Sequence, residues 1–348
     1  MSYPKKIVGS TIQDEYLPTR ENFRYKKVNI LMGTNATGKT SLGRLLMLFT
    51  NYLRDGALER FIEIVDDKRR DAKLIIDFAS LENRLYRFEL TINFQEATTG
   101  EVYKASGDIH FVRINCNDNY EKCKKKLDNK MGKEILYNQF DEGGWSFSYP
   151  QDEGKRNRHF VFEDNEKFIS TLENVLTTLD PSIQEVVQVK EIDNTYAIKF
   201  KNQSILLKDG EIEKTNMLSS GTRAGIDISY NIAALMCDLH DFFYCDELFS
   251  YINSDIEKAC LSIMIEKLTE GKQLFFTTHN TDILDMQLPK HSFMFLRKDV
   301  MDGESIINCI NAEDYLKRNT DSLKHAVEND LFCTAPNLSS LYRITETD

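Results

Sequence analysis

The sequence predicts an α/β fold built around one phosphate-binding loop, and three observations support that class. First, residues 28–32 form a short apolar run with the character of a buried strand. Second, residues 33–40 match the pattern G-x-x-x-x-G-K-[ST] without a mismatch, and apolar residues at helical spacing follow them. Third, two later apolar runs, at residues 242–245 and 274–276, each end in polar residues. A strand, a glycine-bounded loop and a helix in this order are the context in which such a loop binds phosphate.

The loop at residues 33–40 is predicted to bind a nucleoside triphosphate. Its glycines let the backbone wrap closely around phosphate, and the N-terminus of the following helix adds positive potential. Lys39 is expected to reach the β- and γ-phosphates, and the Thr40 hydroxyl is expected to sit on Mg²⁺. A chance match to the bare pattern is expected in roughly one percent of chains of this length. The predicted nucleotide-binding residues here are Gly33, Thr34, Asn35, Ala36, Thr37, Gly38, Lys39, Thr40 and Ser41.

Composition limits the class of protein. The chain has 348 residues, of which 41% are apolar, so it can bury a full core. No apolar run reaches the ~20 residues that span a bilayer, and the N-terminal segment lacks the apolar stretch of an export signal. The seven widely spaced cysteines suit reduced thiols, which together with these features predicts a cytoplasmic protein. The net charge of −11 argues against a broadly basic surface that coats nucleic acid, although it leaves a local patch open.

The elements between the loop and residue 215 follow from periodicity. A helix is expected at about residues 40–53, with residues 56–70 extending the helical layer, and another at 168–179, where Pro181 follows its end. Residues 141–158, which contain glycines and a proline, are expected as a loop or small insertion. Strand-like alternation is expected at residues 73–78, 85–94, 109–114, 183–189, 196–200 and 204–207.

A serine-rich segment precedes another predicted helix. Residues 217–223 read Met-Leu-Ser-Ser-Gly-Thr-Arg and lead into apolar residues at helical spacing. Either Ser219 or Ser220 would serve as the N-cap. Ser, Gly and Thr ahead of a helix also make an anion site on physical grounds. Taken alone, the segment is interpreted as a capped helix.

The two apolar runs in the second half end in residues that can act on a triphosphate. Residues 242–245 are followed by Asp246 and Glu247. An Asp at the end of a core strand can hold Mg²⁺ through its water shell, and an adjacent Glu can orient or deprotonate the attacking water. Residues 274–276 are followed by two threonines and His279, which could donate a hydrogen bond to a γ-phosphate. The other five histidines are interpreted as structural.

Beyond His279, residues 292–296 and 305–310 are expected to form a β-hairpin around an Asp-Gly turn. Residues 312–348 are expected as helical and loop segments. The sequence contains no long heptad run between residues 39 and 218, so a long coiled-coil arm is not predicted.

Four elements in fixed order resemble the ABC-type ATPase head: the phosphate loop, Leu-Ser-Ser-Gly-Thr, apolar-Cys-Asp-Glu and Thr-Thr-His-Asn. The likeness is to the soluble branch shared by SMC proteins, DNA-repair ATPases and overcoming-lysogenization-defect (OLD) ATPases. The sequence is most similar to the compact "AAA family ATPase" proteins of bacterial anti-phage defence operons, relatives of the ATPases in Septu, PARIS and retron systems. The likeness covers residues 28–53 and 217–284 and is weak over 55–215.

The resemblance implies one ABC-type domain over residues 1–348. That domain would have a mixed core sheet flanked by helices, an antiparallel β-subdomain and a helical lobe that carries the signature motif. It would contain a variable insertion at about residues 100–182 and a C-terminal hairpin with a helical segment at about 290–348. The glutamine of the family's Q-loop is not placed by the likeness, and Gln95 and Gln139 are the two candidates.

On matching positions the resemblance also assigns roles. Lys39 would belong to Walker A, Asp246 would be the Walker B aspartate and a metal ligand with Thr40, Glu247 the catalytic carboxylate and His279 the switch histidine. The signature motif would supply further nucleotide-binding residues, namely Ser219, Ser220 and Gly221. In such proteins the signature of one subunit closes over the nucleotide held by Walker A of another. The resemblance therefore implies a homodimer, or a larger even-numbered assembly, around two ATP molecules.

The expected activity is Mg²⁺-dependent hydrolysis of ATP to ADP and phosphate in a dimerising switch. The resemblance implies a sensor ATPase of an anti-phage system that controls a separate effector, such as a nuclease or other toxin from a neighbouring gene. A DNA-repair or chromosome-associated SMC-like head is the alternative, with nucleic acid left open as a partner. A transporter subunit is disfavoured because Ser220 and Thr222 stand where the transporter signature has Gly and Gln, and no membrane partner is expected. Intact Glu247 and His279 count against a scaffold that binds ATP without turnover.

Overall fold

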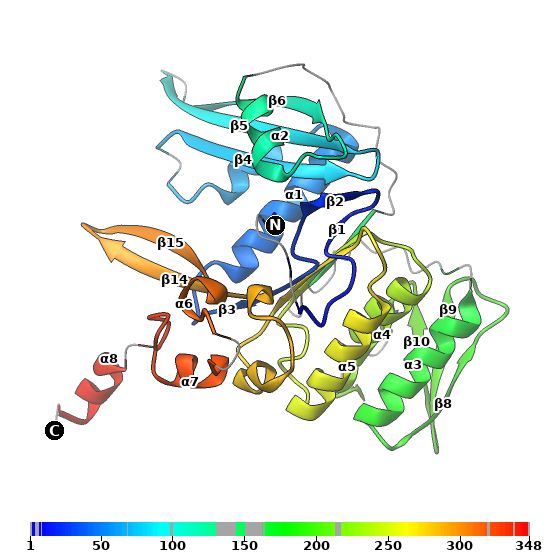
Figure 1. Ribbon diagram of the computed structural model, residues 1–348. Helices are drawn as coiled ribbons and strands as arrows, with labels where there is room; N and C mark the ends of the chain where they lie inside the picture. Colours follow the sequence, from blue (N-terminus) through cyan, green and yellow to red (C-terminus); the bar gives the residue numbers. More distant parts are fainter. Residues whose placement is uncertain are drawn as a thin grey trace.

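A mixed six-stranded sheet forms the centre of the fold, in the order β15-β14-β3-β13-β12-β7 (Figure 1). Its strands are β3 (Val28–Met32), β7 (Trp145–Ser148), β12 (Phe242–Asp246), β13 (Gln273–Thr277), β14 (Phe293–Met301) and β15 (Glu304–Asn311). The strands from β14 to β7 run parallel, and β15 pairs antiparallel with β14. The computed structural model describes residues 2–3, 7, 9–67, 69–97, 100–129, 144–149, 162, 164–212, 217–318, 321–336 and 338–346.

Helices cover both faces of this sheet. The helices concerned are α1 (Lys39–Asp55), α4 (Ser220–Met236) and α5 (Ser254–Lys267). Successive side chains of a strand point to opposite faces, so on β3 Leu31 packs in the cluster that contains Leu42 of α1. The preceding residue, Ile30, packs in the cluster that contains Ile228 of α4 and Leu261 of α5. All five residues of β3 are buried, as expected for a central strand covered on both faces.

An antiparallel three-stranded sheet packs on the second half of α1. Its strands, in the order β4-β5-β6, are β4 (Ala72–Ser80), β5 (Arg84–Ala97) and β6 (Gly100–Arg113). Phe49 and Tyr52 of α1 pack against Phe88 of β5 and Phe61, which lies on the 3-10 helix η1 (Glu59–Ile64). Residues 56–70 are predicted to extend the helical layer, and this six-residue 3-10 helix is the helix found there among the described residues.

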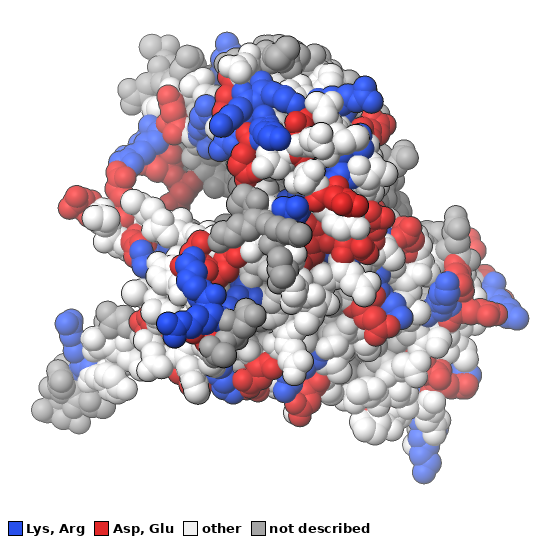
Figure 2. Space-filling model, viewed as in Figure 1, with Lys and Arg blue, Asp and Glu red and all other residues white. Residues whose placement is uncertain are grey.

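Helix α2 (Tyr120–Asp128) is joined to the antiparallel sheet by a charged network. Arg87 of β5 donates two hydrogen bonds to Asp77 of β4, at 2.7 and 2.8 Å, and one to Asp128 at the end of α2, at 2.6 Å. The Tyr120 hydroxyl donates to the same Asp77 carboxylate at 2.8 Å. Figure 2 shows basic side chains gathered over α2, whose exposed lysines are Lys122, Lys124 and Lys125.

A second lobe combines a four-stranded antiparallel sheet with α3 (Asn165–Leu179), which packs beside α4 (Figure 1). The sheet has the order β11-β10-β9-β8, formed by β8 (Ile183–Gln188), β9 (Thr195–Phe200), β10 (Ser204–Lys208) and β11 (Glu211–Ile212). The two helices approach closely, since a Cβ added at Gly225 of α4 would lie 2.5 Å from Leu179 of α3. Helix α4 therefore packs tightly against α3 in this lobe.

The remaining elements of the described chain are short. They are β1 (Tyr16–Leu17), β2 (Arg20–Arg24), η3 (Thr281–Asp285), η4 (Lys290–Ser292), α6 (Ala312–Tyr315), α7 (Leu323–Glu328), α8 (Ser339–Tyr342) and η5 (Arg343–Glu346). Within the part of the chain that the structure describes, no helix has both the length and the apolar composition needed to cross a bilayer.

The predicted fold class is confirmed. The phosphate loop lies between β3 and α1, the core sheet is mixed, and an antiparallel sheet and a lobe that contains α4 flank it, as expected for an ABC-type head. The predicted hairpin is β14–β15, with Asp302 and Gly303 at its turn. The helix predicted at 168–179 is α3, which begins three residues earlier, at Asn165, because the Asp164 side chain caps it.

The loop prediction for residues 141–158 is wrong at Trp145–Ser148. These four residues form β7, which pairs parallel with β12 at the edge of the core sheet. A four-residue strand carries little local signal, and its pairing with a strand almost a hundred residues away supplies the hydrogen bonds that fix it. The strand predicted at 109–114 begins at residue 100 as β6. Whether residues 100–182 form an insertion stays a prediction.

Candidate nucleotide-binding site

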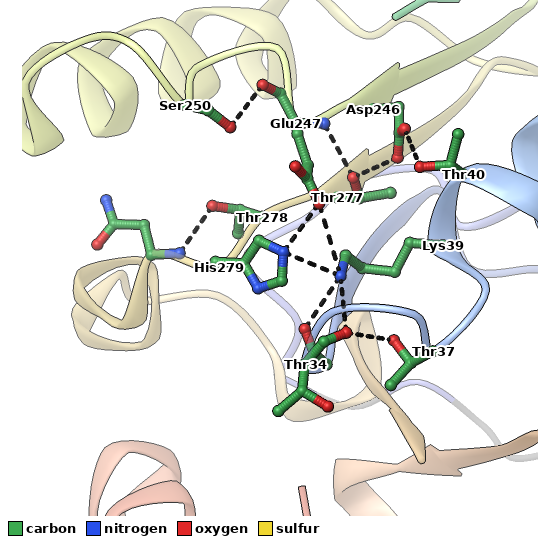
Figure 3. Close-up of polar contacts among 12 residues, drawn as sticks. Thr34, Thr37, Lys39, Thr40, Asp246, Glu247, Ser250, Thr277, Thr278 and His279 are labelled. Atoms are coloured by element: carbon green, nitrogen blue, oxygen red, sulfur yellow. Dashed lines mark hydrogen bonds and ion pairs between the residues drawn. The ribbon is translucent and has the colours of Figure 1, made fainter. Parts of the chain in front are cut away.

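The predicted site residues follow three neighbouring parallel strands. β3 pairs with β13, and β13 pairs with β12, so the carboxyl ends of all three lie at one edge of the core sheet. In this register Asp246 is opposite Thr277, and Thr277 is opposite Leu31. The phosphate loop, Glu247 and His279 therefore lie close together at this edge of the sheet (Figure 3). Ligand sites of α/β sheets form where the carboxyl ends of strands meet.

The phosphate loop has the backbone that its glycines permit. Three residues of the loop have positive φ: Gly33 at 156°, Ala36 at 62° and Gly38, immediately before α1, at 89°. A Cβ added at Gly33 would lie 2.6 Å from the Leu296 carbonyl oxygen, which explains why the position requires glycine. The Thr37 hydroxyl donates to the Thr34 carbonyl at 2.8 Å and closes the loop on itself.

The Lys39 amine turns back into the loop. Its Nζ donates to the carbonyls of Gly33 and Thr34, at 3.0 and 3.3 Å, while the side chain is buried. The same atom lies 3.1 Å from His279 Nε2 and 3.6 Å from Glu247 Oε1 (Figure 3). Burial lowers the pKa of Lys39, and the nearby carboxylate of Glu247 opposes this shift. A cation, a carboxylate and an imidazole thus face one another at the mouth of the loop.

Glu247 is held by its backbone as well as by its side chain. It adopts φ 47°, a left-handed conformation that costs a non-glycine residue roughly 1–2 kcal/mol. Its N–H donates to the Thr277 hydroxyl at 2.9 Å and lies 3.2 Å from the Thr277 carbonyl, and its own carbonyl accepts from the Ser250 hydroxyl at 2.8 Å. Its Oε1 lies 2.8 Å from His279 Nε2. Strained backbone at a cluster of titratable groups is typical of functional sites.

Asp246 and Thr40 form an oxygen-rich pair beside this cluster. The Thr40 hydroxyl donates to Asp246 Oδ2 at 2.6 Å, and the Thr277 hydroxyl donates to Oδ1 at 2.7 Å. Asp246 is 3% exposed, so burial raises its pKa, while the two hydroxyl hydrogen bonds oppose that shift. A buried carboxylate and a hydroxyl next to a phosphate loop are the donor types that Mg²⁺ prefers. The residues present therefore fit the metal that the sequence implies.

The described residues around the loop line an open pocket of about 160 Å³. Its lining residues are Asn35, Ala36, Thr37, Gly38, Lys39, Thr40, Ser41 and Glu247. These include seven of the predicted nucleotide-binding residues and the predicted catalytic carboxylate. Asp246 and His279 do not line this pocket, but each contacts a residue that does, Thr40 and Lys39 respectively.

The signature segment lies elsewhere on the chain. Ser219, not Ser220, is the N-cap of α4, because its hydroxyl accepts from the Thr222 N–H at 3.0 Å. A Cβ added at Gly221 would lie 2.9 Å from the Tyr251 carbonyl, so this segment packs against the loop that follows Glu247. Among the described residues that line the phosphate pocket, none belongs to the signature segment.

The sequence reasoning missed two residues that shape the site. Thr277 bridges Asp246 and Glu247, and its place in a Thr-Thr-His-Asn run was the available signal. The Tyr244 hydroxyl donates to the Lys39 carbonyl at 2.6 Å, and its ring occupies the space that a Cβ at Gly43 would need, at 2.4 Å. Tyr244 had no local signal, because its role depends on how α1 packs on β12.

The candidates for the Q-loop remain untested. Gln95 lies on β5 of the antiparallel sheet, and Gln139 lies outside the described residues. The role proposed for either residue stays a prediction.

Comparisons with known proteins give a partial likeness only. No protein-family model matches the sequence, and no curated protein matches it. Among solved structures, an Smc head bound to the C-winged helix domain of ScpA is 11% identical with a TM-score of 0.43, over 84% of this chain and 94% of that one. The SMC head domain from Thermotoga maritima is 11% identical with a TM-score of 0.31, over 82% and 90%.

An Smc head with an extended coiled coil, bound to the C-terminal domain of ScpA from Pyrococcus furiosus, is 9% identical with a TM-score of 0.43. The match covers 84% of this chain and 93% of that one.

Proposed function

We propose that this chain is a Mg²⁺-dependent ATPase that hydrolyses ATP to ADP and phosphate. The observation that carries the proposal is the meeting of Lys39, Glu247 and His279 at the mouth of the phosphate loop, within 3.6 Å of one another. This trio combines the cation that binds phosphate, the carboxylate that activates water and an imidazole that can bond to a γ-phosphate. The Thr40–Asp246 pair beside it supplies oxygen ligands for a divalent cation.

Each residue has a distinct part in the proposed reaction. The Lys39 amine exchanges its bonds to the loop carbonyls for bonds to the β- and γ-phosphates. Glu247 orients a water molecule for attack on the γ-phosphorus and accepts its proton, while His279 holds Glu247 and stabilises the phosphate oxygens. Mg²⁺ bound by Thr40, with Asp246 as its second partner, would neutralise part of the triphosphate charge. Most of the rate enhancement would be electrostatic, because phosphoryl transfer needs positioning and charge stabilisation rather than covalent chemistry from the protein.

We further propose that two copies of the chain complete each site. The N-terminus of the 17-residue helix α4 is an anion-binding end, and Ser219, Ser220 and Gly221 lie there. Since none of the described lining residues of the pocket comes from this segment, a second copy is the source of the signature contact in the proposal. The binding energy of ATP would then favour a closed dimer, and hydrolysis would reset it.

We propose that the biological role is that of a sensor ATPase in an anti-phage system, acting on a separate effector protein. The support is the sequence likeness of residues 28–53 and 217–284 to the ATPases of such systems. The alternative is an SMC-like head in DNA repair or chromosome maintenance. Turnover that rises on addition of double-stranded DNA favours either the sensing of invading DNA or this alternative, whereas turnover that responds only to a co-expressed neighbouring gene product favours the defence role.

The ATPase proposal is tested with two variants and a matched control. Purified wild-type chain, Lys39→Ala and Glu247→Gln are assayed for phosphate release, and their mass is measured by light scattering with and without Mg²⁺-ATP. Glu247→Gln is expected to bind ATP, lose turnover and accumulate as a dimer, while Lys39→Ala loses nucleotide binding. Glu266→Gln, the same change at an exposed position on α5, should behave as wild type. Equal turnover in all four proteins would refute the site assignment.

A further inference from the structure

One buried carboxylate accepts hydrogen bonds from the residues on both sides of His279 in the chain. Glu257 lies in the first turn of α5 and is 3% exposed. Its Oε1 accepts from the Thr278 hydroxyl at 2.8 Å, and its Oε2 accepts from the Asn280 amide nitrogen at 2.6 Å. The two residues that Glu257 contacts are therefore the immediate neighbours of His279 in the chain.

The same loop is fixed by further bonds around this contact. The Asn280 amide uses its second N–H on the Ser254 hydroxyl at 2.7 Å, and its oxygen accepts from the Asp282 N–H at 2.9 Å. The Thr278 hydroxyl, which donates to Glu257, also accepts from the Asn280 N–H at 3.0 Å. Because every polar atom of the Asn280 amide is engaged, the backbone on either side of His279 has little freedom to shift.

The imidazole itself is the exposed part of this arrangement. The His279 side chain is 39% exposed, whereas Thr278 is buried, and Figure 3 shows the ring directed away from Thr278 and towards Lys39 and Glu247. An exposed ring can adopt several rotamers unless its backbone is fixed. The ring contacts Glu247 at 2.8 Å and Lys39 at 3.1 Å. Glu257 and Ser254, which hold the backbone on either side of the ring, are not among the residues that line the pocket.

Burying the carboxylate of Glu257 costs free energy unless hydrogen bonds compensate for the lost water. Burial raises the pKa of Glu257, and the hydrogen bonds from Asn280 and Thr278 oppose the shift. Both partners of Glu257 are neutral donors, and each donates to a different carboxylate oxygen. The contact therefore needs a side chain with two acceptor oxygens. A glutamine has the same size but replaces one acceptor with a donor, and it can satisfy only one of the two bonds in the observed geometry.

We infer that Glu257 is a positioning residue for His279, fixing the imidazole against Glu247 and Lys39 through Thr278 and Asn280. This inference rests on the proposed ATPase function, in which His279 contacts the γ-phosphate. A misplacement of about 1 Å at a reacting group can cost up to 10²-fold in rate. Glu257 would thus affect turnover without touching ATP.

Kinetics of Glu257→Gln test the inference, with Glu266→Gln on the exposed face of α5 as the matched control. Glu257→Gln is expected to lower kcat about 10-fold and to leave KM for ATP within about 2-fold, since ground-state binding is unaffected. In a His279→Ala background the same substitution should have no further effect on kcat, because its route to the reaction is gone. A further 10-fold loss in that background, or wild-type kcat in the single variant, would overturn the inference.

A second measurement does not depend on turnover. In protein labelled with ¹⁵N-histidine, the His279 ring resonance is assigned by its loss in His279→Ala. Glu257→Gln should shift or broaden that resonance and leave the other histidines unchanged, and Glu266→Gln should change none. If Glu257→Gln fails to fold, Thr278→Val removes one of the two bonds from the other side and should act in the same direction.

The two failures are distinguishable. A wild-type chain that releases no phosphate overturns the proposed function, and the ring resonance then decides alone whether Glu257 positions His279. An unmoved resonance in a folded variant overturns the inference whatever the turnover.

Discussion

Replacing Thr277 with valine isolates the polar role of one fully buried side chain. The two residues have the same shape, and Thr277 is 0% exposed, so the change removes hydrogen bonds without opening a cavity. The lost bond is the 2.7 Å donation to the Asp246 carboxylate, and a hydrogen bond to a charged group contributes about 1.5–3 kcal/mol. The change also removes the bond from the Glu247 N–H to the Thr277 hydroxyl. This second loss adds little, because the same N–H keeps the Thr277 carbonyl as a partner at 3.2 Å.

We therefore expect Thr277→Val to lower the free energy of unfolding by about 1.5–3 kcal/mol and to weaken Mg²⁺-dependent nucleotide binding about 10–100-fold, the usual effect of removing a group that orients a metal ligand. Urea unfolding measures the first quantity, and titration of a fluorescent ATP analogue at varied MgCl₂ measures the second. Thr277→Ser, which keeps the hydroxyl, is the control. Identical Mg²⁺ dependence in the valine and serine variants would refute this account of Asp246.

Two further predictions concern stability. Arg87→Ala should destabilise the fold by about 3–5 kcal/mol in urea unfolding, since it leaves the buried Asp77 carboxylate without its cation. Asp128→Asn, at a carboxylate that is 53% exposed, should cost under about 1 kcal/mol. Equal losses of stability in the two variants would show that burial does not set the difference. Ser219→Ala should cost about 1 kcal/mol through loss of the α4 cap, whereas Ser220→Ala should be close to neutral; the reverse order in thermal unfolding would contradict the assignment of the cap.

The parts of the site that could be predicted from sequence are those with a local cause. A glycine is needed at 33 and 38 because of a close backbone approach and a left-handed turn, so the phosphate loop is recognisable wherever it occurs. Asp246, Glu247 and His279 follow apolar runs, and parallel strands bring such ends together. Four of the five residues at 28–32 are apolar, because that strand is covered on both faces.

The parts that could not be predicted depend on partners remote in sequence. β7 is a strand because β12 pairs with it, and nothing in the four residues from Trp145 announces that pairing. Glu257 and Tyr244 act on the site across helix–sheet contacts, at separations of 21 and 205 residues from Thr278 and Lys39. A periodicity argument sees each segment singly, and these contacts exist only after the segments pack.

The left-handed backbone at Glu247 also decides which replacements this position will accept. Asparagine and aspartate adopt positive φ more readily than other residues with side chains, whereas β-branched residues do so with great strain. Valine or threonine would force the chain around residue 247 to rearrange before any question of water activation arises. In a saturation library at this codon, a β-branched variant would be inactive because of its backbone strain. Only the variants that keep the parental backbone would test the role of the Glu247 carboxylate.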